Sequence, residues 1–197
     1  TGPGTINLAA TLTVNQATNL TCGATIGGAS GLTKAGTATL TLTGPNTYSG
    51  TTNVNVGVLN IQNNTGLGDV SGDTVVAANA TLRLNSNGGA AIAVAGEVLT
   101  LTASPLTTVN NGMSLQSTAG ANSWGGPIVL ASGLLGAMVT IETTSNLTLF
   151  GPVLNLLTSA NPVGLAKFGA GTLTFSGSDA NAYFGGTNVT DDLEDPN

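Results

Sequence analysis

Hydrophobic and polar residues alternate with a period of two in many short runs along the chain. In residues 37–43, Thr occupies one set of alternate positions, while Ala38, Leu40 and Leu42 occupy the other. Such alternation places the apolar side chains on one face of a β-strand. Further runs are marked by Leu20/Cys22/Ala24/Ile26, Val54/Val56, Leu59/Ile61, Leu82/Leu84, Ile92/Val94, Leu99/Leu101, Val139/Ile141, Leu147/Leu149 and Leu173/Phe175. The sequence therefore predicts an all-β protein built from many short strands.

One unit of this pattern occurs twice. Residues 31–44 return as residues 164–177, each with a Gly-Leu-x-Lys-x-Gly start followed by Thr-Leu-Thr. The turn at 46–50 and the Thr-Asn-Val at 52–54 return at 181–185 and 187–189, after a gain of two residues in a loop. A strand–turn–strand unit cannot bury its apolar face alone, whereas stacked units form a continuous core. The repeat therefore favours a parallel β-helix over a β-sandwich.

The dimensions of such a β-helix follow from the strand spacing. With one coil per roughly 20–25 residues, we expect about eight or nine coils. At about 4.8 Å between neighbouring strands, these coils make a rod roughly 40 Å long. We expect a single β-helix over residues 1–190, followed by an acidic C-terminal tail at residues 191–197.

The repeated motif resembles the autotransporter-associated β-strand repeat of bacterial surface proteins. The resemblance lies in Gly-Leu-Thr-Lys-Ala-Gly at 31–36, Thr-Leu-Thr-Leu at 39–42 and Asn-Thr-Tyr-Ser-Gly-Thr-Thr at 46–52. Residues 80–84, 92–101 and 122–128 resemble the segments that usually follow this repeat, so the resemblance covers about residues 20–190. It implies a right-handed parallel β-helix displayed outside the cell, typically a stalk or an adhesive surface without catalysis.

The low charge of the chain excludes several classes of function. Only 6% of its residues are charged, with three Lys and Arg, nine Asp and Glu, no His and a net charge of −6. Without His, neither a Ser-His-Asp triad nor a histidine metal site can form. Three cations are too few for nucleic-acid binding. The apolar stretch at 127–141 is shorter than the roughly 20 residues of a membrane-spanning helix.

Composition and termini add expectations about location and assembly. One cysteine excludes an internal disulfide, and the wealth of Thr, Asn and Gly suits a bacterial cell surface or a secreted protein. The chain begins at Thr1 without a leader, and no β-barrel segment follows the repeats, so we expect a processed product, a fragment or an assembling subunit. Residues 1–8 contain no amphipathic capping helix. Uncapped coils can stack end to end, which predicts a homo-oligomer or filament.

The leading hypothesis is therefore a non-catalytic extracellular rod, acting as a stalk, an adhesin with a cell-surface or glycan partner, or a fibre subunit. The alternative is a carbohydrate-binding or polysaccharide-degrading β-helix protein. We assign no catalytic, cofactor-binding or metal-binding residue, and we expect no cofactor.

Acidic residues offer two candidate sites, each with a simpler structural interpretation. The tail acids could bind calcium, although their spacing matches neither an EF-hand nor a nonapeptide calcium motif, or they form a solvated acidic end. The tail acids are Asp191, Asp192, Glu194 and Asp195. Asp69 and Asp73 could act as the paired carboxylates of a glycosidase, but Asp beside Gly and Ser is also an ordinary turn residue.

The remaining candidates are better explained by packing. Cys22 alternates in phase with its apolar neighbours, so we expect it to point inward rather than to cross-link chains. Lys34 and Lys167 occupy equivalent places in the two copies, and we expect solvated charges near strand ends that satisfy turn carbonyls. For the aromatic residues, packing in turns is favoured over sugar-binding platforms. These aromatic residues are Tyr48, Tyr183 and Trp124.

Overall fold

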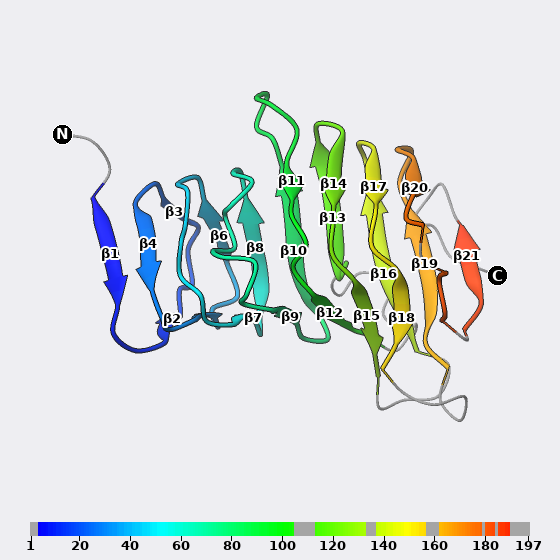
Figure 1. Cartoon of the computed structure of the whole chain (residues 1–197), viewed down its shortest axis with the longest axis horizontal. Coiled ribbons are helices and arrows are strands. Elements are labelled where there is room, and N and C mark those ends of the chain that lie inside the picture. The colour runs from blue at the N-terminus through cyan, green and yellow to red at the C-terminus, as the bar shows by residue number, and fades with distance from the viewer. Residues whose placement is uncertain are drawn as a thin grey trace.

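The computed structural model describes residues 4–104, 113–132, 137–156, 162–178, 180–183 and 185–189. The named elements in these ranges are all β-strands, and each pairs in parallel with strands of neighbouring coils (Figure 1). The first and last strands lie at opposite ends of an elongated stack. Successive parallel strands separated by one turn of chain define a parallel β-helix, so the predicted fold class is confirmed.

Four sheets form the wall of this rod. The eight-stranded sheet contains β3 (Leu20–Cys22), β6 (Thr39–Leu42), β8 (Gly57–Ile61), β10 (Ala80–Asn85), β13 (Leu115–Ala119), β16 (Met138–Thr143), β19 (Gly164–Phe168) and β21 (Thr187–Val189). The seven-stranded sheet contains β2 (Leu12–Val14), β5 (Leu32–Lys34), β7 (Thr52–Val54), β9 (Thr74–Val76), β12 (Leu99–Thr102), β15 (Ile128–Ala131) and β18 (Val153–Asn155). The two smaller sheets contain β1 (Thr5–Leu8) with β4 (Thr25–Gly28), and β11 (Ala93–Val94), β14 (Asn122–Trp124), β17 (Leu147–Leu149) and β20 (Leu173–Phe175).

The two smaller sheets lie along one third face of the rod. Each coil runs through the seven-stranded sheet, then the eight-stranded sheet, then this face. Between β4 and β11 the face continues without regular strands. There the amide of Thr47 donates to the carbonyl of Ile26 at 2.7 Å, and the amide of Asp69 donates to the carbonyl of Tyr48 at 2.8 Å.

Coil length varies along the rod. Early neighbours are 20 residues apart, as in the bond between Ile26 and Asn46, and Arg83 contacts Gln116 across 33 residues. Near the other end, the paired residues Leu165 and Thr187 are 22 residues apart. The expected 20–25 residues per coil therefore holds towards both ends and is exceeded in the middle. Added residues lie in the corners between sheets, and the connection from β10 to β11 projects well beyond its neighbours in Figure 1.

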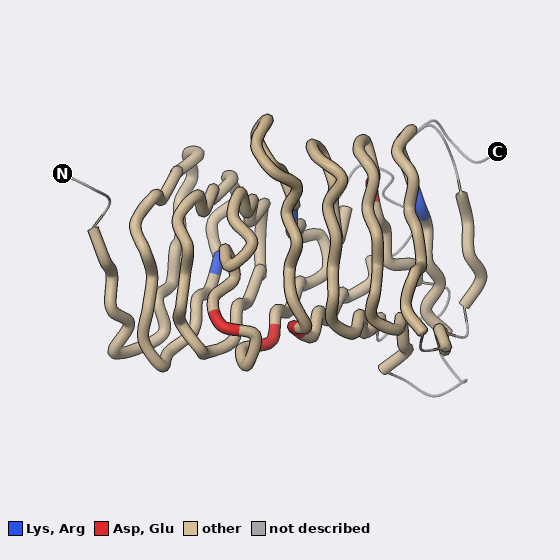
Figure 2. The backbone as a smooth tube through the Cα atoms, turned by 45° about the horizontal axis from the view of Figure 1, so that its top comes forward, with Lys and Arg blue, Asp and Glu red and all other residues tan. Residues whose placement is uncertain are grey.

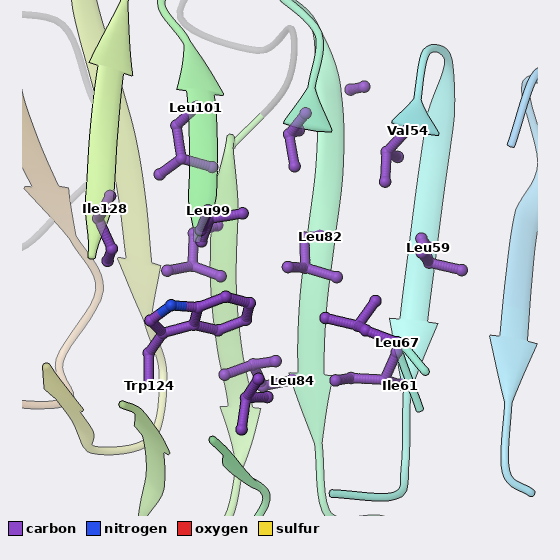
Figure 3. Packing of buried hydrophobic residues seen from close by; sticks show 14 of the residues in the cluster. Val54, Leu59, Ile61, Leu67, Leu82, Leu84, Leu99, Leu101, Trp124 and Ile128 are labelled. Carbon is purple, nitrogen blue, oxygen red and sulfur yellow. The ribbon is translucent and has the colours of Figure 1, made fainter. Parts of the chain in front are cut away.

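Apolar side chains from all faces fill the interior. Leu59, Leu82 and Leu115 occupy paired positions on three successive strands of the eight-stranded sheet, and all three are fully buried. Burying one such side chain contributes about 1.5–3 kcal/mol. Figure 3 shows Trp124 among aliphatic side chains such as Leu84 and Leu99. The alternation in the sequence thus marks a continuous core.

Three large residues of the alternating runs do not point into this core, among them Phe175, which is 39% exposed on β20 at the edge of its sheet. Val56 is 41% exposed because β7 ends at Val54 and the chain turns a corner before β8. Leu20 is 46% exposed because β3 lies at the edge of its sheet, with a neighbouring strand on one side. Cys22 is half-buried and packs against the core, as predicted. The described ranges contain no helix with the length and apolar character needed to cross a membrane.

Candidate functional site

The two copies of the repeat occupy different faces of the rod. Lys34 lies in β5 of the seven-stranded sheet, whereas its equivalent Lys167 lies in β19 of the eight-stranded sheet. The chain passes through five further strands of the seven-stranded sheet after β5, and then advances by one more face to reach β19. The second copy is therefore rotated about the rod axis by one face.

Both copies of the repeat make the same local hydrogen bonds, although they lie on different faces. In each copy the lysine Nζ donates to the carbonyl of the glycine two residues later, Gly36 or Gly169. The repeated tyrosine is likewise hydrogen-bonded to a threonine four residues later, as in the 2.6 Å contact between Tyr48 Oη and Thr52 Oγ1. The motif is therefore a local corner structure that fits more than one face.

Lys34 is fully buried, and this result corrects the expectation of a solvated charge. Its Nζ donates to the carbonyl of Gly36 and, at 3.0 Å, to the carbonyl of Val56 in the next coil. Burial lowers the pKa of the Lys34 ammonium. The predicted contact with turn carbonyls is confirmed, and it links two coils.

The aromatic side chains also face inward. Tyr48 and Trp124 are fully buried, so neither ring offers a face to a sugar, and packing is the correct interpretation for both. Burial raises the pKa of the Tyr48 phenol. The Trp124 indole Nε1 donates to the carbonyl of Glu97 at 3.1 Å. Tyr183 is half-buried and packs against the end of the core.

Asp69 shapes a turn. Its Oδ1 accepts a hydrogen bond from the Ser71 amide at 2.9 Å, and hydrogen bonds from Ser71 lower the pKa of the Asp69 carboxyl. The turn interpretation is therefore confirmed for Asp69. Asp73 is exposed just before β9. The tail acids lie outside the described residues, so the calcium hypothesis remains a prediction.

A buried carboxyl group that we did not single out from the sequence lies close to these turns. Glu97 is 2% exposed, and its Oε1 accepts a hydrogen bond from Thr74 Oγ1. The pKa of Glu97 is raised to about 8, chiefly by burial and also by the negative charge of Asp73, while the bond from Thr74 opposes both effects. Red segments gather at this edge of the rod in Figure 2. The sequence pattern already indicates that Glu97 points inward, because it alternates in phase with the buried Leu99 and Leu101.

Glu97 and Asp73 do not provide glycosidase chemistry in this arrangement. A raised pKa suits a general acid, but that acid must reach the oxygen of the scissile bond. The Glu97 side chain is enclosed by the core and bound to Thr74. Within the described ranges, no group of three or more His, Cys, Asp or Glu side chains could hold a metal ion.

The outer face of the eight-stranded sheet carries a row of polar side chains. Arg83 Nε donates to Gln116 Oε1 at 2.8 Å, and Gln116 Nε2 donates to Glu142 Oε2 at 2.6 Å. Earlier in the row, Asn60 Nδ2 donates to Thr41 Oγ1 at 3.2 Å. We call these five residues the outer ladder. Their register places them on consecutive strands from β6 to β16.

The comparison with protein families identifies the repeated unit. Residues 32–61 and 165–191 match the family model described as the passenger-associated-transport-repeat. These matches coincide with the two copies in the sequence and with the corner contacts of Lys34 and Lys167. The chain thus contains two autotransporter passenger-type repeats, as the resemblance indicated. Searches of curated proteins and of solved structures found no match.

Proposed function

We propose that this chain is a non-catalytic, surface-exposed passenger rod of a bacterial cell, which holds and presents an extended surface as a stalk or adhesin. The single observation that carries the proposal is that both passenger-type repeats contain the same internal contact, in which a lysine Nζ donates to a backbone carbonyl at a corner of the rod.

The internal contacts support a structural role. The side chains best suited to chemistry are bound within the stack: Lys34 binds carbonyls of two coils, Glu97 binds Thr74 and Tyr48 binds Thr52. Each contact joins residues in or beside the corners between faces. A buried charged or polar group that is hydrogen-bonded within the stack fixes the register of the coils and is not accessible to a substrate.

Detection on intact cells tests the proposed location. Antibodies raised against the exposed connection at residues 87–91 are applied to cells that produce the protein, with lysed cells as the matched control. The proposal predicts equal labelling before and after lysis, and loss of the signal when intact cells are treated with an external protease. Labelling that requires lysis would refute surface exposure.

The fibre form of the proposal is tested separately by negative-stain microscopy of the purified chain across a concentration series. Rods of constant width that lengthen with concentration support assembly by end-to-end stacking. Short rods of about 40 Å at every concentration contradict it and support a single stalk or adhesin segment.

The outer ladder favours glycan binding as a second candidate function. Planar amide, guanidinium and carboxylate groups in a row can bind vicinal sugar hydroxyls. A neutral glycan suits the net charge of −6 better than an acidic one. We expect the purified chain to bind neutral oligosaccharides on a glycan array and Gln116→Ala to weaken that binding. Absence of binding, or binding unchanged by Gln116→Ala, would contradict this candidate.

A further inference from the structure

Glu97 occupies a tightly packed corner of the rod. It lies between β11 on the third face and β12 in the seven-stranded sheet. On one side, the amide of Thr74 donates to the carbonyl of Val98 at 3.0 Å; on the other, the amide of Leu99 donates to the carbonyl of Pro127 at 2.9 Å. A Cβ added at Gly126 would approach the Glu97 carbonyl oxygen to 1.9 Å. Adjacent coils therefore leave little free space here.

Burial and the negative charge of Asp73 favour the neutral form of the Glu97 side chain. The Thr74 hydroxyl in β9 donates to Oε1 and favours the ionised form, but burial has the larger effect, and the indole N–H of Trp124 in β14 donates to the Glu97 backbone carbonyl. The titratable groups close to Glu97 are Asp73, which precedes β9, and Tyr48, which lies on the third face. The Asp73 carboxylate disfavours a second negative charge beside it, whereas the Tyr48 phenol, whose pKa burial raises, is uncharged between pH 5 and pH 8. Ionised Glu97 would therefore lack a compensating cation in this corner.

We propose that Glu97 is a proton-operated latch: in its neutral form it holds the corner between β9, β12 and β14 closed, and in its ionised form it opens this corner to water. The opening is local, because the sheets on both sides retain their cores. This corner is therefore most protected in acidic surroundings and loosens as the medium becomes alkaline.

The direction of this effect follows from proton linkage. The ordinary pKa of a glutamate carboxyl group is 4.5, and burial in the folded rod raises the pKa of Glu97 to about 8. Between these values the closed state retains a proton that the open state releases, so opening becomes easier as the pH rises. The equilibrium constant for opening increases up to about tenfold per pH unit across this window, and the effect vanishes below about pH 4.

Hydrogen exchange measured by mass spectrometry tests the latch. Exchange of peptides covering residues 72–76 and 96–102 is followed at pH 5, 6, 7 and 8 and corrected for the intrinsic pH dependence of amide exchange. The proposal predicts that protection here falls by about 100-fold or more between pH 5 and pH 8. Peptides covering β6 and β16 should keep their protection.

Two variants separate the latch from general effects of charge. Glu97→Gln keeps the shape and the hydrogen-bond acceptor for Thr74 but cannot ionise, so protection should no longer depend on pH. Glu142→Gln changes an acid on the outer ladder and should behave like the unaltered chain. The same pH dependence in Glu97→Gln would overturn the proposal.

A direct titration of the Glu97 carboxyl group tests the latch even if Glu97→Gln does not fold. The side-chain carboxyl carbon of Glu97 is followed by NMR in the unaltered chain. A midpoint near 8 supports the latch, whereas a midpoint below about 5 would overturn it, because the group would then already be ionised throughout the window.

Discussion

The paired lysines of the repeat allow one structural contribution to be measured within a single protein. Lys34 is fully buried and donates to carbonyls in two coils, whereas Lys167 is half-buried and donates to Gly169. The two residues occupy equivalent positions of the Gly-Leu-x-Lys-x-Gly motif, and each donates to the carbonyl of the glycine two residues later. A difference between their variants therefore reports burial and the bond to the next coil.

The expected magnitude for Lys34 is the sum of packing and hydrogen bonding. Lys34→Met keeps most of the buried stem and removes the donor, which costs about 1–2 kcal/mol because the loss of charged hydrogen bonds is partly offset by relief of a buried charge. Lys34→Ala also removes about three buried methylene groups at about 0.8 kcal/mol each. We therefore expect a total loss of about 3–4 kcal/mol for Lys34→Ala.

Lys167→Ala should cost about 1 kcal/mol or less, since water can replace the lost donor at a half-buried site. The free energy of unfolding of all three variants is measured by urea denaturation, followed by circular dichroism at a fixed pH. Equal losses for Lys34→Ala and Lys167→Ala would refute the inference that Lys34 links two coils. A loss for Lys34→Met as large as that for Lys34→Ala would refute the packing contribution.

Four further substitutions test the packing of the stack. Gly126→Ala should destabilise the rod by several kcal/mol because its Cβ would overlap the Glu97 carbonyl, whereas Gly96→Ala, which has open space, should change the denaturation midpoint little. Leu99→Ala should cost about 2–5 kcal/mol in the same assay, since Leu99 is fully buried; a loss below about 1 kcal/mol would contradict a dry core. Gln116→Ala should cost less than about 1 kcal/mol, because the outer ladder is partly solvated; a larger loss would make the ladder a main support of the fold.

Periodicity and repetition in the sequence predicted the architecture of the rod. Alternation in residues 37–43 placed Leu40 and Leu42 in the core, and stacking of repeated units gave a parallel β-helix. The rotation of the second copy was not predictable in this way. It depends on how many residues each corner absorbs between Lys34 and Lys167, and the coils expand from 20 to as many as 33 residues.

The candidate site was predicted less well than the fold. The phase of alternation pointed Lys34 and Glu97 inward, together with Leu32 and Leu99, but their charge argued for solvent. The groups that make burial possible come from other coils: the carbonyl of Val56 for Lys34 and the hydroxyl of Thr74 for Glu97. Such partners become visible only when the register between coils is known.

A disulfide cross-link tests whether the second repeat belongs to the same stack of coils as the first but begins on the eight-stranded sheet instead of the seven-stranded sheet. In a Cys22→Ser background, Glu142→Cys is combined with Phe168→Cys, because these residues pair on adjacent strands of the eight-stranded sheet. Neighbouring parallel strands lie about 4.8 Å apart, within the range that a disulfide spans. The matched control combines Leu154→Cys, on β18 of the seven-stranded sheet, with Phe168→Cys. We expect an intramolecular cross-link in the first pair and none in the control, whereas a cross-link formed by the control pair alone would place the second repeat on the seven-stranded sheet and contradict the rotation.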